Sequence, residues 1–123
     1  MELTTNFSKI EFESHDGSEM PEDVLNNITL LAQQLQILRD YLGRSIHVNS
    51  GYRSPEHNAS IGGVKNSQHV LGKAADIYVK GMTSSELHQT IEKLISENKL
   101  TIKGLGLYSN FVHVDIRNGK KAR

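Results

Sequence analysis

The chain has 123 residues, of which 37% are hydrophobic and 23% charged. This length and composition predict one compact domain over residues 1–123 with a small core. The 14 Lys and Arg balance the 14 Asp and Glu, so the basic excess typical of a dedicated nucleic-acid binder is absent. Cysteine is also absent, which excludes disulfides, thiolate metal sites and cysteine nucleophiles. Any metal ion must therefore be held by His, Asp or Glu.

The sequence carries no signal for a membrane or for secretion. It contains no apolar run long enough to span a bilayer, and its first residues lack the basic and apolar segments of a signal peptide. We therefore expect no stable membrane insertion. The last seven residues include four bases, which predict a solvated tail or a patch that meets an anionic surface; these bases are Arg117, Lys120, Lys121 and Arg123.

In the first half of the chain, one strong helical pattern is flanked by weaker elements. Residues 1–20 are polar and predict a loop or short strand packed by its aromatic side chains. A helix is then predicted from Pro21, which suits a first turn, to Gly43, a favourable C-cap. Its apolar positions recur at steps of three and four; they are Val24, Ile28, Leu31, Leu35, Leu38 and Leu42. The alternation in residues 46–50 predicts a short strand.

The middle of the chain is irregular and glycine-rich. Residues 51–73 contain four glycines, which break regular structure. Within this stretch, Pro55 at a first helical position predicts a short helix over residues 54–60. The run of small and apolar residues that follows predicts a strand over residues 74–79.

The last third of the chain predicts one helix and two strands. Thr83 and Glu86 form a capping box that begins an amphipathic helix. Residues 102–108 and 111–117 then predict two closing strands. Because helices and strands are mixed without a regular alternation, we predict an α+β fold with a small antiparallel sheet packed against helices.

Polar residues with metal-binding chemistry share one face of the predicted sheet. Asp76 lies on the face of its strand opposite Ile77, and His113 and Asp115 share a face of theirs. If the two strands are neighbours, Asp76 and His113 oppose each other with Cβ atoms about 5 Å apart, close enough to bind one ion. His69 precedes Asp76 by seven residues, so its loop can fold back over this face.

Two histidines and one carboxylate leave the fourth position of a tetrahedral metal for water. This is the ligand pattern of a catalytic zinc site and differs from a closed structural site. A zinc ion lowers the pKa of such a water to about 7 and polarises a carbonyl group. Amide hydrolysis is the reaction that this chemistry suits.

Three segments of the chain resemble a known family. Residues 67–76 (SQHVLGKAAD) are similar to the SxHxxGxAxD motif of the zinc D-Ala-D-Ala carboxypeptidase family, which shares its fold with the hedgehog signalling domain. Residues 111–115 (FVHVD) resemble the second motif of that family, and residues 50–55 (SGYRSP) its SGYRS segment. Glu11 and Asn58 also match the small branch with an HxD motif, which includes bacteriophage endolysins and periplasmic murein peptidases. The resemblance covers nearly the whole chain.

The resemblance implies a ligand set and a substrate-binding residue. It assigns His69, Asp76 and His113 as ligands of Zn²⁺. It places Arg53 against the substrate, where a guanidinium suits a carboxylate or the carbonyl that becomes an oxyanion. A structural salt bridge within its loop is the alternative role of Arg53.

The general base is the least determined part of the predicted site. Several relatives place an acid three residues before the last His ligand, where this chain has Asn110, which cannot accept the proton. Asp115 shares the face of His113 and is the natural substitute as the catalytic base. An equally good interpretation is that Asp115 orients the imidazole of a ligand.

Three further residues are candidates for binding substrate. Ser67 precedes His69 by two residues and suits either a hydrogen bond to a substrate terminus or a turn within its loop. His57 lies near Arg53 in the sequence and lines the site or, as the simpler alternative, the surface of a short helix. Tyr78 shares the face of Asp76, so it either reaches the site or packs against a neighbour.

These observations predict a zinc peptidase that cuts peptidoglycan stem peptides as a monomer, without nucleic acid. It is expected to be a D-Ala-D-Ala carboxypeptidase or a murein endopeptidase of endolysin type. The alternative is a catalytically inactive zinc-binding interaction module of the same fold, which Asn110 favours. We expect a protein made in the cytoplasm that acts on the cell wall, as in phage lysis or a virion, or a periplasmic protein whose signal was removed.

Overall fold

The computed structural model describes residues 1–122, so Arg123, the last base of the predicted tail, lies outside the described residues. The predicted long helix is α1 (Glu22–Leu42), and its apolar stripe is buried as predicted. It ends at Gly43, whose φ of 65° places it in the left-handed region and whose N–H donates to the carbonyl of Arg39 at 2.9 Å. This is the expected glycine cap.

The other two helices begin as the sequence predicts. Helix α2 (Pro55–Ser60) has Pro55 in its first turn, and the hydroxyl of Ser54 accepts from the backbone N–H of His57. Helix α3 (Ser84–Ser96) follows a complete capping box: the N–H of Glu86 donates to Thr83 Oγ1 at 3.1 Å, and the N–H of Thr83 donates to Glu86 Oε1 at 2.8 Å.

The first twenty residues contain more regular structure than a single short strand. Strands β1 (Glu2–Thr4) and β2 (Phe7–Ser8) form a two-stranded antiparallel sheet, and the 3₁₀ helix η1 (Lys9–Phe12) follows. Phe7 and Phe12 are buried with their ring centroids 6.1 Å apart. The aromatic packing predicted for this segment therefore attaches it to the core.

Four strands form the central sheet, which confirms the predicted α+β class. Strands β3 (His47–Ser50), β4 (Ala74–Tyr78), β5 (Gly104–Leu107) and β6 (Val112–Asp115) pair antiparallel in the order β3-β4-β6-β5. Strands β5 and β6 are shorter than the sequence predicts. At the end of β6, the Asp115 side chain accepts from the backbone N–H of Arg117 at 3.1 Å.

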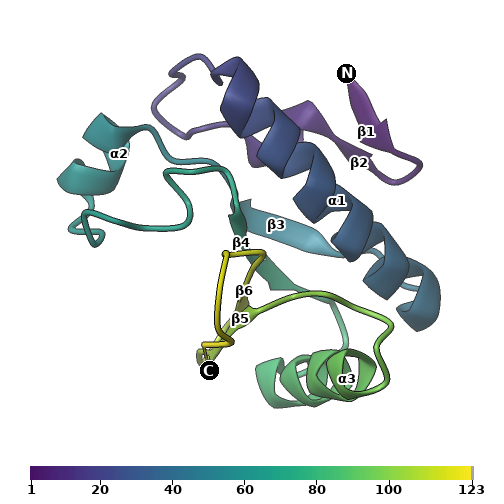
Figure 1. Cartoon of the computed structure of the whole chain (residues 1–123). Coiled ribbons are helices and arrows are strands. Elements are labelled where there is room, and N and C mark those ends of the chain that lie inside the picture. The colour runs from purple at the N-terminus through teal and green to yellow at the C-terminus, as the bar shows by residue number, and fades with distance from the viewer. Residues whose placement is uncertain (123) are drawn as a thin grey trace.

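One face of the sheet is covered and the other is polar. Ile77, Val112 and Val114 point to the covered face and join the apolar sides of α1 and α3 in the buried core. Helix α1 runs past β3, whereas α3 lies beyond the β5–β6 end (Figure 1). The opposite face carries Asp76 and His113. Within residues 1–122, no helix has both the length and the apolar character needed to cross a membrane.

Candidate metal centre

Two of the predicted ligands lie side by side on the polar face of the sheet. Strands β4 and β6 pair so that Asp76 is directly opposite His113, as the alternation of side chains predicts. Asp76 Oδ1 lies 3.0 Å from Nδ1 of His113. The register is fixed because a slip by one residue would turn Ile77 and Val112 out of the core.

The loop before β4 brings His69 back over this face. The backbone N–H of His69 donates to Ser67 Oγ at 3.1 Å, and Gly72 turns the chain with a φ of 74°. A Cβ atom on Gly72 would lie 2.7 Å from Val24 Cγ1, so only glycine satisfies both the turn and the close packing on α1. This loop places Nε2 of His69 3.2 Å from Asp76 Oδ1.

The three donor groups fit a metal ion. One ligand atom from each of His69, Asp76 and His113 lies within 4.8 Å of the others. The outer nitrogen of each imidazole faces an oxygen acceptor: His69 Nδ1 lies 2.8 Å from the carbonyl of Gly51, and His113 Nε2 lies 2.8 Å from Asp115 Oδ2. With the hydrogens on those outer nitrogens, the inner nitrogens present lone pairs toward the Asp76 carboxylate. A cation between them satisfies all three groups, and two imidazoles with one carboxylate suit zinc.

Without a metal, protons take the place of the cation. Burial alone would lower the pKa of His113, but its hydrogen bonds to Asp115 and Asp76 outweigh burial and raise it to about 9. Burial would raise the pKa of Asp76, but the hydrogen bonds from His113 and His69 hold it well below its usual range. The metal-free site is therefore an ionised carboxylate with a protonated His113.

The three donors lie in a cleft of about 320 Å³. Its other lining residues form two walls: Arg53, Val64 and Ser67 come from the segments that precede β4, whereas Tyr108 and Phe111 come from the β5–β6 hairpin. The rings of Tyr108 and Phe111 are stacked with centroids 4.6 Å apart. The cleft thus combines the three metal-binding side chains with the Arg53 guanidinium and an aromatic wall formed by Tyr108 and Phe111.

Arg53 lies at the edge of the donor group with its guanidinium toward Asp76. Its Nη2 is 3.5 Å from Asp76 Oδ2, Nη1 is 3.3 Å from Asn58 Oδ1, and Nε is 3.3 Å from Ser50 Oγ. These long contacts hold the side chain in place while its guanidinium still lines the cleft. The geometry is compatible with both predicted roles, a structural ion pair and contact with substrate.

Asp115 lies behind His113 and is fully buried. Its Oδ2 accepts from Nε2 of His113 at 2.8 Å and from Nη2 of Arg117 at 2.6 Å, and its Oδ1 accepts from Nε of Arg117 at 2.9 Å. Burial would raise its pKa, but Arg117 and then His113 hold the pKa well below its usual range. This is the arrangement of a carboxylate that orients a ligand imidazole.

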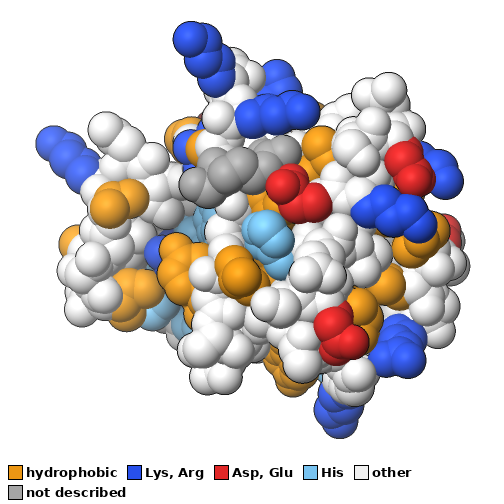
Figure 2. Space-filling model, turned by 90° about the horizontal axis from the view of Figure 1, so that it is seen from below, with side chains coloured by type: hydrophobic (Ala, Val, Ile, Leu, Met, Phe, Trp, Pro, Cys, Tyr) orange, Lys and Arg blue, Asp and Glu red, His pale blue; other side chains and the backbone are white. Residues whose placement is uncertain are grey.

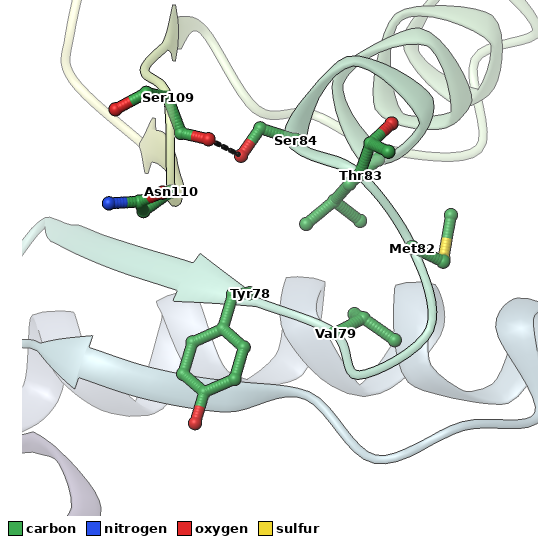
Figure 3. Close-up of a pocket in the computed structure, with 8 residues that line it drawn as sticks. Tyr78, Val79, Met82, Thr83, Ser84, Ser109 and Asn110 are labelled. Carbon is green, nitrogen blue, oxygen red and sulfur yellow. Dashed lines mark hydrogen bonds between the residues drawn. The ribbon is translucent and has the colours of Figure 1, made fainter.

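The structure does not bring every predicted substrate-binding residue into the cleft. Ser67 lines it, but His57 lies on α2 with its ring centroid 5.8 Å from that of His15. Tyr78 stacks on His47 with centroids 4.8 Å apart, and its ring points away from Asn110 in Figure 3. Asn110 lines a neighbouring cavity at the start of α3, where Ser84 Oγ donates to the carbonyl of Ser109 at 3.3 Å.

Three residues that the sequence analysis did not assign to the site contact it. Tyr108 and Phe111 line the cleft, and Arg117 binds Asp115. The strand alternation contains a signal for two of them: Phe111 precedes His113 by two residues and Arg117 follows Asp115 by two, so all share one face. Strand alternation contains no such signal for Tyr108. Its place beside Phe111 follows from the hairpin, in which its N–H donates to the carbonyl of Phe111 at 3.1 Å.

Comparison with known proteins places the chain in a family. Residues 3–115 match the family model of peptidase M15. The chain belongs to the peptidase M15 family. Similar curated proteins are the probable peptidoglycan L,D-endopeptidase MepK of Haemophilus influenzae, 39% identical over 77 residues, and the peptidoglycan L,D-endopeptidase MepK of Escherichia coli, 32% identical over 94 residues. These matches cover 57% and 69% of this M15 chain and 38% and 48% of the relatives.

A third relative is a carboxypeptidase. The zinc D-Ala-D-Ala carboxypeptidase of Streptomyces albus G is 40% identical over 52 residues, which is 42% of this M15 chain and 20% of the relative. The chain therefore spans less than half the length of each of these three relatives. The family resemblance predicted from the motifs is confirmed.

Proposed function

We propose that this protein is a zinc-dependent peptidase that hydrolyses peptide bonds in bacterial peptidoglycan. The observation that carries the proposal is the convergence of His69, Asp76 and His113 within a cleft that also contains Arg53. Membership of the peptidase M15 family supports peptide hydrolysis. Similarity to the MepK peptidoglycan endopeptidases supports a peptidoglycan substrate, and similarity to the Streptomyces zinc D-Ala-D-Ala carboxypeptidase supports zinc.

In this proposal the three donors hold zinc, and the chain around them fixes their orientation. Zinc at this position supplies a Lewis acid that polarises a carbonyl and makes water more acidic. His69 Nε2 and His113 Nδ1 provide the lone pairs, because the outer ring nitrogens keep their hydrogens and donate hydrogen bonds to the Gly51 carbonyl and the Asp115 carboxylate. All donors come from one chain, which supports a monomer as the active unit.

Arg53 is proposed to bind substrate. Its guanidinium lines the cleft, and Nη2 points toward the Asp76 carboxylate. A substrate carboxylate, or a carbonyl oxygen that gains negative charge, would find paired N–H donors there. Ser67 is proposed as a second polar contact with the substrate on the same side of the cleft. The stacked Tyr108 and Phe111 are proposed to contact the substrate as the aromatic wall.

Asp115 is proposed to orient His113 and not to act as the general base. Its full burial and its contacts with His113 and Arg117 support this choice over the catalytic role that the strand pattern allowed equally. Asp76 is the one carboxylate among the residues that line the cleft within residues 1–122. In this proposal, the proton that the attacking water loses is taken by another water molecule or by a group of the substrate.

That lack of a separate acid favours a second candidate function, a zinc-binding interaction module without catalysis. Asn110 occupies the position at which several relatives carry an acid, and it lines a different cavity from the donors. In this alternative the cleft binds a peptide and releases it unchanged. The presence of Arg53 and of the aromatic wall in the cleft is compatible with both candidates.

The substrates and setting follow from the proposed chemistry. We propose stem peptides of the cell wall as the substrate class, with either a terminal D-Ala-D-Ala bond or an internal murein bond as the target. On the face seen in Figure 2, cationic side chains are dispersed and interspersed with acidic ones, which agrees with a partner other than nucleic acid. The phage lysis, virion and periplasmic settings stay predictions.

The test is digestion of defined muropeptides by zinc-loaded protein, followed by mass spectrometry. A peptidase yields two products whose masses sum to that of the substrate plus one water, and the fragments identify the bond. The matched control is the His69→Ala variant. Intact muropeptides after incubation with a protein that holds stoichiometric zinc would contradict the peptidase and support the binding module.

A further inference from the structure

Arg117 grips the buried Asp115 carboxylate with three donors. Its Nη2 lies 2.6 Å from Oδ2, its Nε 2.9 Å from Oδ1, and its backbone N–H 3.1 Å from the same Oδ1. We propose that Arg117 is a positioning residue that acts through Asp115 to hold His113 in the orientation needed to bind the metal. This inference rests on the proposed metal site and adds a residue that does not touch the metal.

The Asp115 carboxylate depends on these donors. Its side chain is fully buried, and an ionised carboxylate in such surroundings is stable only when paired and hydrogen-bonded. Arg117 supplies the paired charge with the Nε and Nη2 donors on one edge of its planar guanidinium, and His113 donates a further hydrogen bond to Oδ2. Both oxygens are thereby fixed, and Oδ2 points at the His113 ring.

The neighbouring strand leaves room for this carboxylate because it has a glycine beside it. Gly104 of β5 pairs with Asp115 of β6. A Cβ atom on Gly104 would lie 2.0 to 2.2 Å from the three carboxylate atoms, so the Asp115 side chain fills the space that glycine leaves open. The carboxylate therefore lies against Gly104, and the Arg117 side chain and the His113 ring donate to its oxygens.

The consequence reaches the metal site through the His113 ring. With Oδ2 held by Arg117, the ring is aligned by its Nε2 contact at 2.8 Å, and its Nδ1 points at Asp76 at 3.0 Å. Lysine at position 117 would keep the charge but lose the planar pair of donors that fixes both oxygens. Partners of this kind typically change metal affinity by 10- to 100-fold when removed.

The alternative is that Arg117 only attaches the C-terminal segment to the sheet. Its outer side lines a separate cavity with Gln34 and Lys103, so a purely local role is physically reasonable. That role predicts a change in stability without a specific change in metal affinity. The two roles are distinguished by whether the effect of Arg117 requires Asp115.

The experiment is a double-mutant cycle on zinc affinity, measured by competition with a chromophoric chelator at fixed pH. The single variants are Arg117→Gln and Asp115→Asn, and the double variant combines them. Lys103→Gln is the matched control, because it removes a cation that lines the same cavity as Arg117 and keeps the backbone N–H that donates to the carbonyl of Asp115 at 3.0 Å. Arg117→Lys provides a milder second variant if Arg117→Gln folds poorly.

We expect Arg117→Gln to weaken zinc binding by about 10- to 100-fold, Arg117→Lys to weaken it less, and Lys103→Gln to leave it unchanged. In the Asp115→Asn background, Arg117→Gln should have little further effect. Unchanged affinity in both Arg117 variants, or equal losses in the two backgrounds, would overturn the inference. If the His69→Ala variant binds zinc as tightly as the wild-type protein does, the proposed metal site itself is wrong. That result is distinct from a failure of the role proposed for Arg117.

Discussion

Zinc binding by this protein should depend steeply on pH, because a proton occupies one of its ligand atoms. His113 lies between Asp76 and Asp115 with hydrogen bonds of 3.0 and 2.8 Å, and its pKa is raised from 6.5 to about 9. At neutral pH, Nδ1 of His113 therefore carries a proton in the metal-free protein. Zinc must displace that proton to reach the lone pair.

The size of the effect follows from the distance between the working pH and that pKa. Each pH unit below about 9 costs a factor of ten in apparent affinity, which is about 1.4 kcal/mol. At pH 7 the penalty from His113 is about 100-fold, and at pH 6 it is about 1000-fold. About one proton should be released for each zinc bound at pH 7.

The same pKa predicts how the metal-free fold responds to pH. Because the pKa of His113 is higher in the folded chain than its ordinary value of 6.5, the protonated ring stabilises the fold. The contribution of about 3 kcal/mol is complete below pH 6.5 and is lost as the pH rises through about 9. The melting temperature of the metal-free protein should therefore fall from pH 6.5 to 9.5, whereas zinc should stabilise the protein more as the pH rises from 6 to 9.

Isothermal titration calorimetry in two buffers of different ionisation enthalpy measures both the affinity and the protons released. His57→Gln is the matched control, because His57 lies outside the donor cluster and its loss should change neither quantity. Affinity that stays constant from pH 6 to 8.5, with no proton released at pH 7, would refute this reasoning.

Three other predictions concern the cleft and its support. Arg53→Lys should lower turnover of muropeptides by at least about tenfold with little loss of stability, since lysine lacks the forked donors; loss of stability with full activity of the folded fraction would make Arg53 structural. Gly104→Ala should destabilise the fold by about 1 to 3 kcal/mol in chemical denaturation, because its Cβ would overlap the Asp115 carboxylate, and an unchanged denaturation midpoint would contradict that packing. Tyr108→Ala should raise KM more than it lowers kcat. Leu107→Ala is the control and should change neither value, because Leu107 is also half exposed but lies outside the cleft. Equal changes in the two variants would show that the aromatic wall does not contact substrate.

The strand pattern predicted which side chains at the centre of the site share a face, and it predicted that Asp76 opposes His113 if their strands are neighbours. Alternation excludes a slip by one residue, because that would turn Ile77 and Val112 out of the core, and the structure shows β4 beside β6 with Asp76 opposite His113. The helix boundaries were similarly well determined, because Gly43 and the Thr83 capping box are local signals. The face of each strand and the ends of these helices depend on residues close together in the sequence.

Features that depend on side-chain direction at the edge of the sheet were not predictable in the same way. Tyr78 shares the face of Asp76, but its ring stacks on His47 of the neighbouring strand and not over the donors. Asp115 shares the face of His113, but its burial follows from Gly104 and Arg117, which alternation cannot reveal. His57 is close to Arg53 in the sequence, yet α2 carries it toward His15.

The central claim is that one zinc ion binds between His69, Asp76 and His113. Crystals of the zinc-loaded protein, with anomalous diffraction recorded on both sides of the zinc absorption edge, test it most directly. We expect one strong anomalous peak per chain at about 2.0 to 2.2 Å from His69 Nε2, His113 Nδ1 and an Asp76 carboxylate oxygen. A peak at another pair of ligands, such as His15 and His57, with none between the three donors, would contradict it.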